Sequence, residues 1–129
     1  MRIANTIVLT LLVAAGLACG YSSKSTPATA GTTPNISTLS PNNASHGSTG
    51  VVLTVNGTNF STNATVNWNG TALTTTYISA QQMMTTIPNA DLETAGTAAV
   101  TVTNPGTSGG QYGGGTLPET SNSMTFTIN

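Results

Sequence analysis

The sequence contains very little charge, and this excludes several classes of function. Only 4% of its 129 residues are charged, and the only basic residues are Arg2 and Lys24. Between Ser25 and Asn129 there is no lysine or arginine. Binding to nucleic acid needs cations that replace the counterions of the phosphates, and polybasic attachment to a membrane needs the same cations. Neither is therefore expected of this chain.

Residues that serve in catalysis and metal binding are also scarce. The single cysteine, Cys19, excludes an internal disulfide and a thiolate metal cluster. The single histidine, His46, lies near serines, but no group that would orient it or bind an oxyanion is evident. Asn89, Asp91 and Glu93 are a candidate for weak calcium binding, although the glycine and terminal glutamate of an EF-hand loop are missing, which favours a solvated helical turn. We expect no enzymatic activity and no cofactor.

Residues 1–18 have the pattern of a secretory signal peptide. Arg2 is followed by an apolar run and then by small residues. The apolar run is shorter than the roughly 20 residues of a transmembrane helix. The sequence from Gly16 to Gly20 resembles a bacterial lipobox, although a large aliphatic residue is expected where Gly16 stands. The resemblance implies lipidation of Cys19. Ordinary signal cleavage that leaves a free cysteine, and an uncleaved anchor, are the alternatives.

Two segments lack any apolar periodicity. Residues 19–34 are rich in Ser, Thr, Ala, Gly and Pro, which is typical of a flexible tether. Residues 107–123 form a long glycine-rich stretch with no P-loop lysine and no helix after it. The sequence predicts disorder in both.

Residues 35–129 read as one domain, organised around the stretch from Val51 to Gly70. Leu53 and Val55 alternate with polar residues, and Val66 and Trp68 do the same, so these four side chains are predicted to face a core. Asn56-Gly57 is predicted to break the first strand, and Phe60 to cover one end of the core. Asn69-Gly70 is the signature of a type I′ hairpin turn, and residues 73–78 are predicted to continue that hairpin.

The remaining runs complete an all-β fold. Residues 83–87, 100–103 and 124–128 alternate as strands, and residues 89–94 are predicted to form one helical turn with Leu92 packed inward. Short strands separated by turn signals indicate an antiparallel β-sandwich. We expect about seven strands, preceded by the signal peptide and the disordered tether.

The order of these motifs resembles that of an IPT/TIG domain. The resemblance rests on runs spread from residue 34 to residue 129: Ile36 with Leu39-Ser40-Pro41, Gly57-Thr58-Asn59-Phe60, Val66-Asn67-Trp68-Asn69-Gly70, Ile87-Pro88, residues 95–106 and residues 121–128. It implies an immunoglobulin-like sandwich. It does not imply one function, since the domain occurs in receptors, transcription factors, carbohydrate enzymes and bacterial surface proteins.

The expected function is a non-enzymatic display, spacer or protein-interaction module of a bacterial cell envelope, anchored through Cys19. A cell-surface carbohydrate-binding module is the alternative, with Tyr77 and Tyr112 as exposed ligand-binding candidates. The expected partners are envelope proteins or surface glycans. Gly20 after Cys19 resembles the signal for outer-membrane delivery in proteobacteria.

Overall fold

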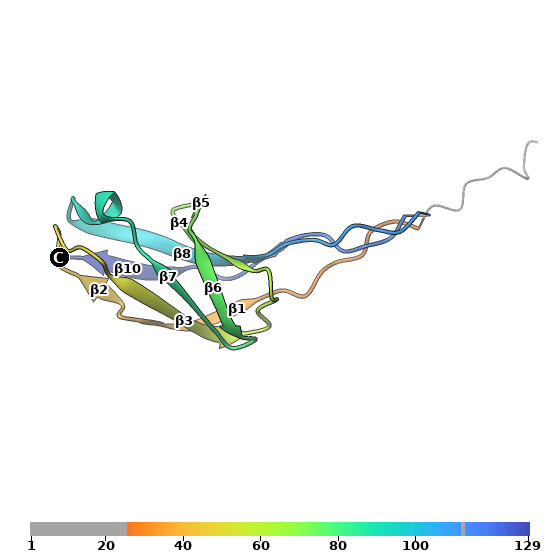
Figure 1. Cartoon of the computed structure of the whole chain (residues 1–129), viewed down its shortest axis with the longest axis horizontal. Helices are drawn as coiled ribbons and strands as arrows, with labels where there is room; N and C mark the ends of the chain where they lie inside the picture. Colours follow the sequence, from red (N-terminus) through yellow and green to blue (C-terminus); the bar gives the residue numbers. More distant parts are fainter. Residues whose placement is uncertain (1–25, 112) are drawn as a thin grey trace, which may run out of the picture.

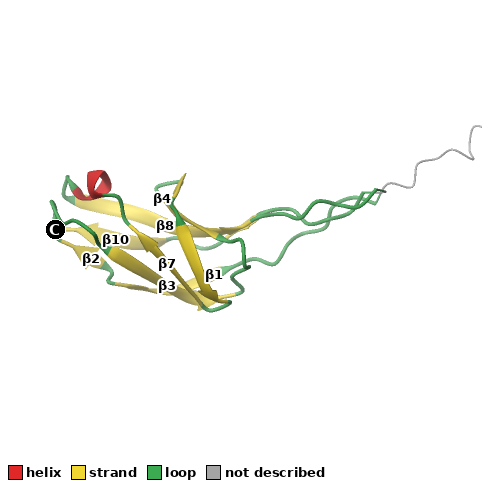
Figure 2. Ribbon diagram, in the orientation of Figure 1, coloured by secondary structure: helices red, strands yellow, loops and turns green. Residues whose placement is uncertain are grey.

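The computed structural model describes residues 26–111 and 113–129, and it is a sandwich of two β-sheets (Figures 1 and 2). The first sheet has the strand order β1-β3-β7-β6, and the second has the order β2-β10-β8-β4-β5, with β9 also paired to β8. The strands are β1 (Asn35–Ser40), β2 (Asn43–Ala44), β3 (Val52–Thr58), β4 (Thr65–Trp68), β5 (Thr71–Ala72), β6 (Thr75–Ser79), β7 (Gln82–Thr86), β8 (Gly96–Asn104), β9 (Glu119–Thr120) and β10 (Met124–Ile128).

The strand order is that of an immunoglobulin-like sandwich. Three strands, β2, β5 and β9, have two residues each, and the other seven of the described part are longer. Taken alone, the seven form sheets of four and three strands, in the A-B-E-D and G-F-C orders of the constant-type immunoglobulin fold. Pairing between the named strands is antiparallel apart from β2, which runs parallel to β10. The predicted all-β class and strand number are therefore confirmed.

The core consists of the side chains that alternation placed inward. Leu53, Val55, Val66, Val100, Val102 and Phe126 are completely buried. Trp68 packs against Phe126 with ring centroids 5.2 Å apart and an interplanar angle of 57°, a tilted aromatic pair. Phe60 covers one end of the core. Leu92, in the short 3₁₀ helix η2 (Asn89–Leu92), is buried and packs into the core. Both of these predictions are confirmed.

In β1, Ile36 and Leu39 are both buried although they are three residues apart. In a regular strand this spacing would put them on opposite faces. The register between β1 and β3 shifts between Ile36 and Thr38, and such a bulge turns the following residues over. The bulge therefore allows both side chains to reach the core.

Two local predictions are wrong. Gly57 does not break its strand, because β3 continues to Thr58. A Cβ at Gly57 would collide with the backbone oxygen of Asn35 and with the ring of Phe60, so glycine is required there for close packing. The hairpin after Asn69-Gly70 ends at Ala72, and the chain then crosses to the other sheet to form β6.

The turn itself was predicted correctly. Asn69 and Gly70 have φ values of 49° and 86°, as a type I′ turn requires. The side-chain oxygen of Asn69 also accepts a hydrogen bond from the backbone N–H of Ala99 at 2.8 Å. This bond joins the turn to β8.

We call residues 26–33, 105–111 and 113–118 the arm. Disorder was predicted for residues 19–34 and 107–123, of which residues 19–25 and 112 lie outside the described part. The segments of the arm instead run side by side away from the end of the sandwich opposite the C-terminus (Figure 1). Thr29 pairs with Thr116, and Thr107 pairs with the same Thr116 from the other side. The described residues of the tether and of the glycine-rich stretch therefore form one structure, in which backbone hydrogen bonds replace the missing apolar contacts.

Candidate functional site

His46, the only histidine of the sequence, is exposed and contacts the backbone of Asn129, which follows β10. Its Nδ1 lies 2.9 Å from the carbonyl oxygen of Asn129, and its backbone N–H donates to the same oxygen at 2.7 Å. The ring is thereby oriented by the backbone oxygen of Asn129. This arrangement gives His46 a part in holding the last strand, not the geometry of a nucleophilic triad.

Asn89, Asp91 and Glu93 lie on η2 and at its end, and all three are exposed. The Asn89 side-chain oxygen accepts a hydrogen bond from the Gly50 N–H at 3.2 Å. Within residues 26–111 and 113–129 there is no cluster of three or more His, Cys, Asp or Glu side chains that could hold a metal ion. The structure thus places the calcium candidate on a helical turn and gathers no further ligand to it.

The three remaining candidates from the sequence have different positions. Tyr77 is half-buried on β6 and packs against the core, so it is less exposed than we expected. Its cross-strand partner is Met83, which is fully buried on the inner face. Tyr112 and Cys19 lie outside the described residues. No helix in the part of the chain that is described has the length and apolar character needed to cross a membrane.

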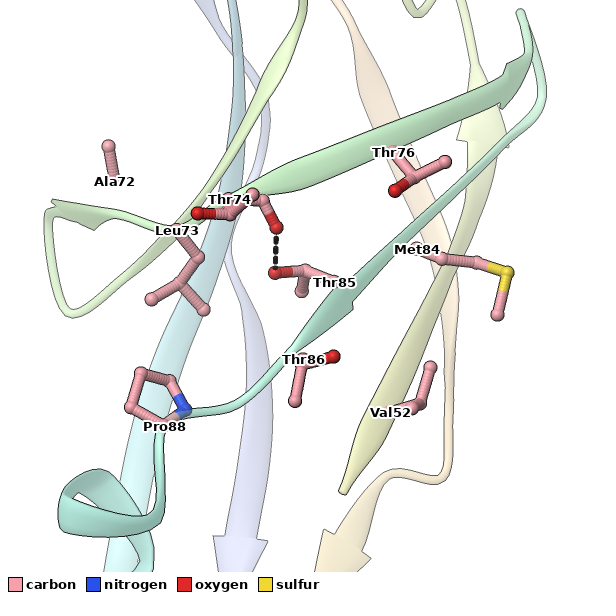
Figure 3. Close-up of a pocket in the computed structure, with 9 residues that line it drawn as sticks. All are labelled: Val52, Ala72, Leu73, Thr74, Thr76, Met84, Thr85, Thr86 and Pro88. Carbon is pink, nitrogen blue, oxygen red and sulfur yellow. Dashed lines mark hydrogen bonds between the residues drawn. The ribbon is translucent and has the colours of Figure 1, made fainter. Parts of the chain in front are cut away.

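An open groove of about 580 Å³ lies beside the edge strand β6 (Figure 3). Its lining contains no charged residue and no aromatic ring: Val52, Ala72, Leu73, Thr74, Thr76, Met84, Thr85, Thr86 and Pro88. The groove is therefore lined by apolar side chains and hydroxyl groups, which suits an uncharged ligand.

The crossover from β5 to β6 forms one wall of the groove. Thr85 is only 3% exposed, and its hydroxyl donates to the carbonyl oxygen of Thr74 at 2.7 Å (Figure 3). Thr75 donates its hydroxyl to the Leu73 carbonyl at 2.9 Å and accepts from the Val66 N–H at the same distance. These hydrogen bonds fix the position of the crossover between the two sheets. The wall of the groove is therefore held in place by hydrogen bonds as well as by apolar packing.

The floor of the groove is the outer face of the first sheet. Val52 on β3 lies opposite Thr86 on β7, and Met84 lies opposite Thr76 on β6. Val52 is 45% exposed. The sequence reasoning missed this surface, although a signal was present: Val52 and Met84 are apolar residues at positions whose parity points away from the core.

The strand β6 leaves one edge of the first sheet open. Among the described residues it pairs only with β7, with a register shift between Tyr77 and Ser79, and Ile78 on it is 48% exposed. Its sequence, TTYIS, contains neither charge nor proline. Lysine and proline are the residues that commonly protect an edge strand against pairing with another chain. The open edge and the groove together form a surface on which an extended, uncharged segment could lie.

A separate polar cluster lies at the base of the arm, where Asn104 is buried with only 5% exposure. Its side-chain nitrogen donates to the carbonyl oxygens of Thr32 and Asn59, each at 2.8 Å. Its side-chain oxygen accepts from the Ser61 N–H at 3.0 Å. One side chain therefore joins the end of β8 to the arm and to the loop between β3 and β4.

Comparison with known proteins gives the family. No curated protein matches the chain in sequence. The family model of the IPT/TIG domain matches residues 34–128, which is most of the chain. Domains of this kind are immunoglobulin-like modules of interaction or spacing and are generally non-catalytic. Because this match covers residues 34–128, the chain belongs to the IPT/TIG domain family.

Proposed function

We propose that the protein is a display and interaction module of a bacterial cell envelope, attached to a membrane through a lipid on Cys19. The lipobox-like sequence around Cys19 and the signal-like leader before it support the anchor. The non-catalytic family supports a binding or spacing role. An outer-membrane or cell-surface location belongs to the same proposal, since Gly20 follows Cys19.

The observation that carries the interaction role is the open β6 edge beside an uncharged groove. An extended segment of an envelope protein would add as a strand to β6 through its backbone and place alternate side chains in the groove. The groove supplies apolar contacts from Val52 and Met84. Backbone pairing provides the affinity in this mode, and the groove provides the selectivity.

Photo-crosslinking from β6 tests this mode. A photoreactive residue replacing Ile78 is expected to crosslink a discrete partner in the native envelope, since this side chain lies exposed at the open edge. The same residue replacing Thr125, exposed on β10 in the second sheet, is the matched control. Equal products from both positions, or none from Ile78, would contradict strand addition at β6.

The anchor is tested by the intact mass of the protein from its native membrane fraction. The lipobox-like sequence predicts a chain that begins at Cys19 and carries acyl groups. Each buried CH₂ of these groups contributes about 0.8 kcal/mol to attachment of the protein to the membrane. The Cys19→Ala variant is expected to lose these groups and to leave the membrane fraction. An unmodified chain in the medium would exclude the lipid anchor and leave a secreted module.

Surface glycans are the alternative partners. The hydroxyls of Thr74, Thr76 and Thr86 in the groove favour this alternative, because sugars form hydrogen bonds with such groups. The groove lining offers no aromatic ring on which a sugar would stack. Glycan binding that persists after Tyr77 is replaced, but is lost after Thr86→Val, would assign the glycan to the groove.

A further inference from the structure

Backbone hydrogen bonds, and not a hydrophobic core, hold the segments of the arm together. The segment from Gly113 to Leu117 lies between two others and is hydrogen-bonded to both. On one side, the Leu117 N–H donates to the Thr29 carbonyl at 2.9 Å, and the Thr29 N–H donates to the Gly115 carbonyl at 3.1 Å. On the other side, Thr107 and Thr116 exchange two backbone hydrogen bonds, each of 3.1 Å.

The three segments approach so closely that only glycine fits at several contacts. A Cβ at Gly31 would lie 2.5 Å from the backbone oxygen of Leu117, and one at Gly113 would lie 2.6 Å from that of Thr26. A Cβ at Gly106 would collide with the backbone oxygen of Thr116, and one at Gly115 with that of Thr107. Gly110, in contrast, has no atom within 4 Å of such a Cβ. The glycines of the arm therefore serve backbone packing at defined positions, which linker flexibility would not require.

The base of the arm is fixed to the sandwich. Asn104 binds the Thr32 carbonyl from inside the fold, and the Asn59 side-chain nitrogen donates to the Thr33 carbonyl at 3.3 Å. The Thr33 hydroxyl donates to a carboxylate oxygen of Glu119 at 3.3 Å. These bonds reach the arm from three different segments, so they determine its direction as well as its attachment.

From these contacts we infer that the arm is a stiff stalk that projects from the sandwich in a set direction and separates it from the N-terminal part of the chain. Residues 26–33 in an extended conformation span about 26 Å at roughly 3.3 Å per residue. A flexible linker of the same length has a root-mean-square span of about 16 Å. Along residues 26–33 the stalk therefore spans a longer and better-defined distance than a flexible linker would.

Distance measurements between spin labels test the stiffness of the arm. The full chain carrying Cys19→Ala is labelled at Ala28→Cys on the arm and at Thr125→Cys on β10, both exposed positions. We expect one narrow distance distribution. In the same background, Gly31→Ala and Gly106→Ala are each expected to broaden the distribution at least twofold and to shorten its mean. Gly110→Ala is the matched control and is expected to leave the distribution unchanged, because its Cβ meets open space.

Two results would overturn the stalk. One is a broad distribution in the parent chain, and the other is a distribution in Gly31→Ala and Gly106→Ala as narrow as that in Gly110→Ala. Thermal unfolding followed by Trp68 fluorescence checks that the sandwich remains folded in each variant. If Gly31→Ala or Gly106→Ala unfolds the sandwich, the distance distribution of the other variant tests the stalk. The measurement is made without an anchor, so it separates failure of the stalk from failure of lipidation, which the mass of the native protein reports.

Discussion

Replacement of Trp68 by alanine is expected to lower the free energy of unfolding by about 3–5 kcal/mol. Trp68 is 4% exposed on β4, and its ring packs 5.2 Å from that of Phe126 on β10. The substitution removes the largest side chain of the core and leaves a cavity. Hydrogen bonding within the sheet keeps the neighbouring strands in place, so the surrounding residues can fill the cavity only in part. For a domain of this size, such a loss corresponds to a fall in Tm of roughly 15 °C or more.

Chemical denaturation of Trp68→Ala and Trp68→Phe measures this effect, followed by far-ultraviolet circular dichroism because the tryptophan signal is lost. Trp68→Phe keeps an aromatic ring against Phe126 and is expected to cost much less. Tyr77→Ala is a second comparison, since Tyr77 is only half-buried at the sheet edge. A Trp68→Ala variant with the Tm of the parent chain would show that Trp68 is not part of the core.

Replacement of Asn104 by alanine is expected to cost about 2–4 kcal/mol, although no charge and little apolar surface are lost. The change leaves the Ser61 N–H and the carbonyls of Thr32 and Asn59 without their partner. A buried polar group that loses its hydrogen bond costs about 1–3 kcal/mol, and water admitted to the site recovers part of this. The loss should also free the base of the arm, because Asn104 is the link to Thr32.

Asn67→Ala is the matched control for Asn104→Ala. Asn67 is half-buried and donates only to the hydroxyls of Thr101 and Thr103, at 3.5 and 2.9 Å. Those hydroxyls can turn to water, so a cost below about 1 kcal/mol is expected. Urea unfolding gives both values. Equal costs for the two asparagines would contradict the assigned role of Asn104, as would an unchanged amide hydrogen-exchange rate at Ser61.

Much of the sandwich is encoded locally. The alternation of Leu53 with Val55 and of Val66 with Trp68 assigned the inner face correctly, because side chains in a strand repeat every two residues. The Asn69-Gly70 turn was equally clear, because few residue pairs accept positive φ at both positions. Such signals lie within a few residues of one another and need no knowledge of the rest of the chain.

Other features left a signal that was interpreted wrongly. Asn56-Gly57 predicts a break in the strand, yet the role of Gly57 is to allow the backbone of β1 to approach closely. Glycine permits unusual backbone angles and also permits close approach, and the sequence does not distinguish the two. The same ambiguity applies to the glycines of the arm, where composition suggested a linker.

The sequence by itself therefore determined the fold class, the core residues and the lack of lysine and arginine from Ser25 to Asn129, because hydrophobic alternation and charge content are local or additive properties. Only the tertiary structure decided the arm, the groove and the network around Asn104. In the arm, Thr29 bonds to Gly115 across a separation of 86 residues. The groove combines residues from β3, β5, β6 and β7 and from the crossover between the sheets. Contacts of this kind depend on how the sheets pack, and they leave no periodic pattern along the chain.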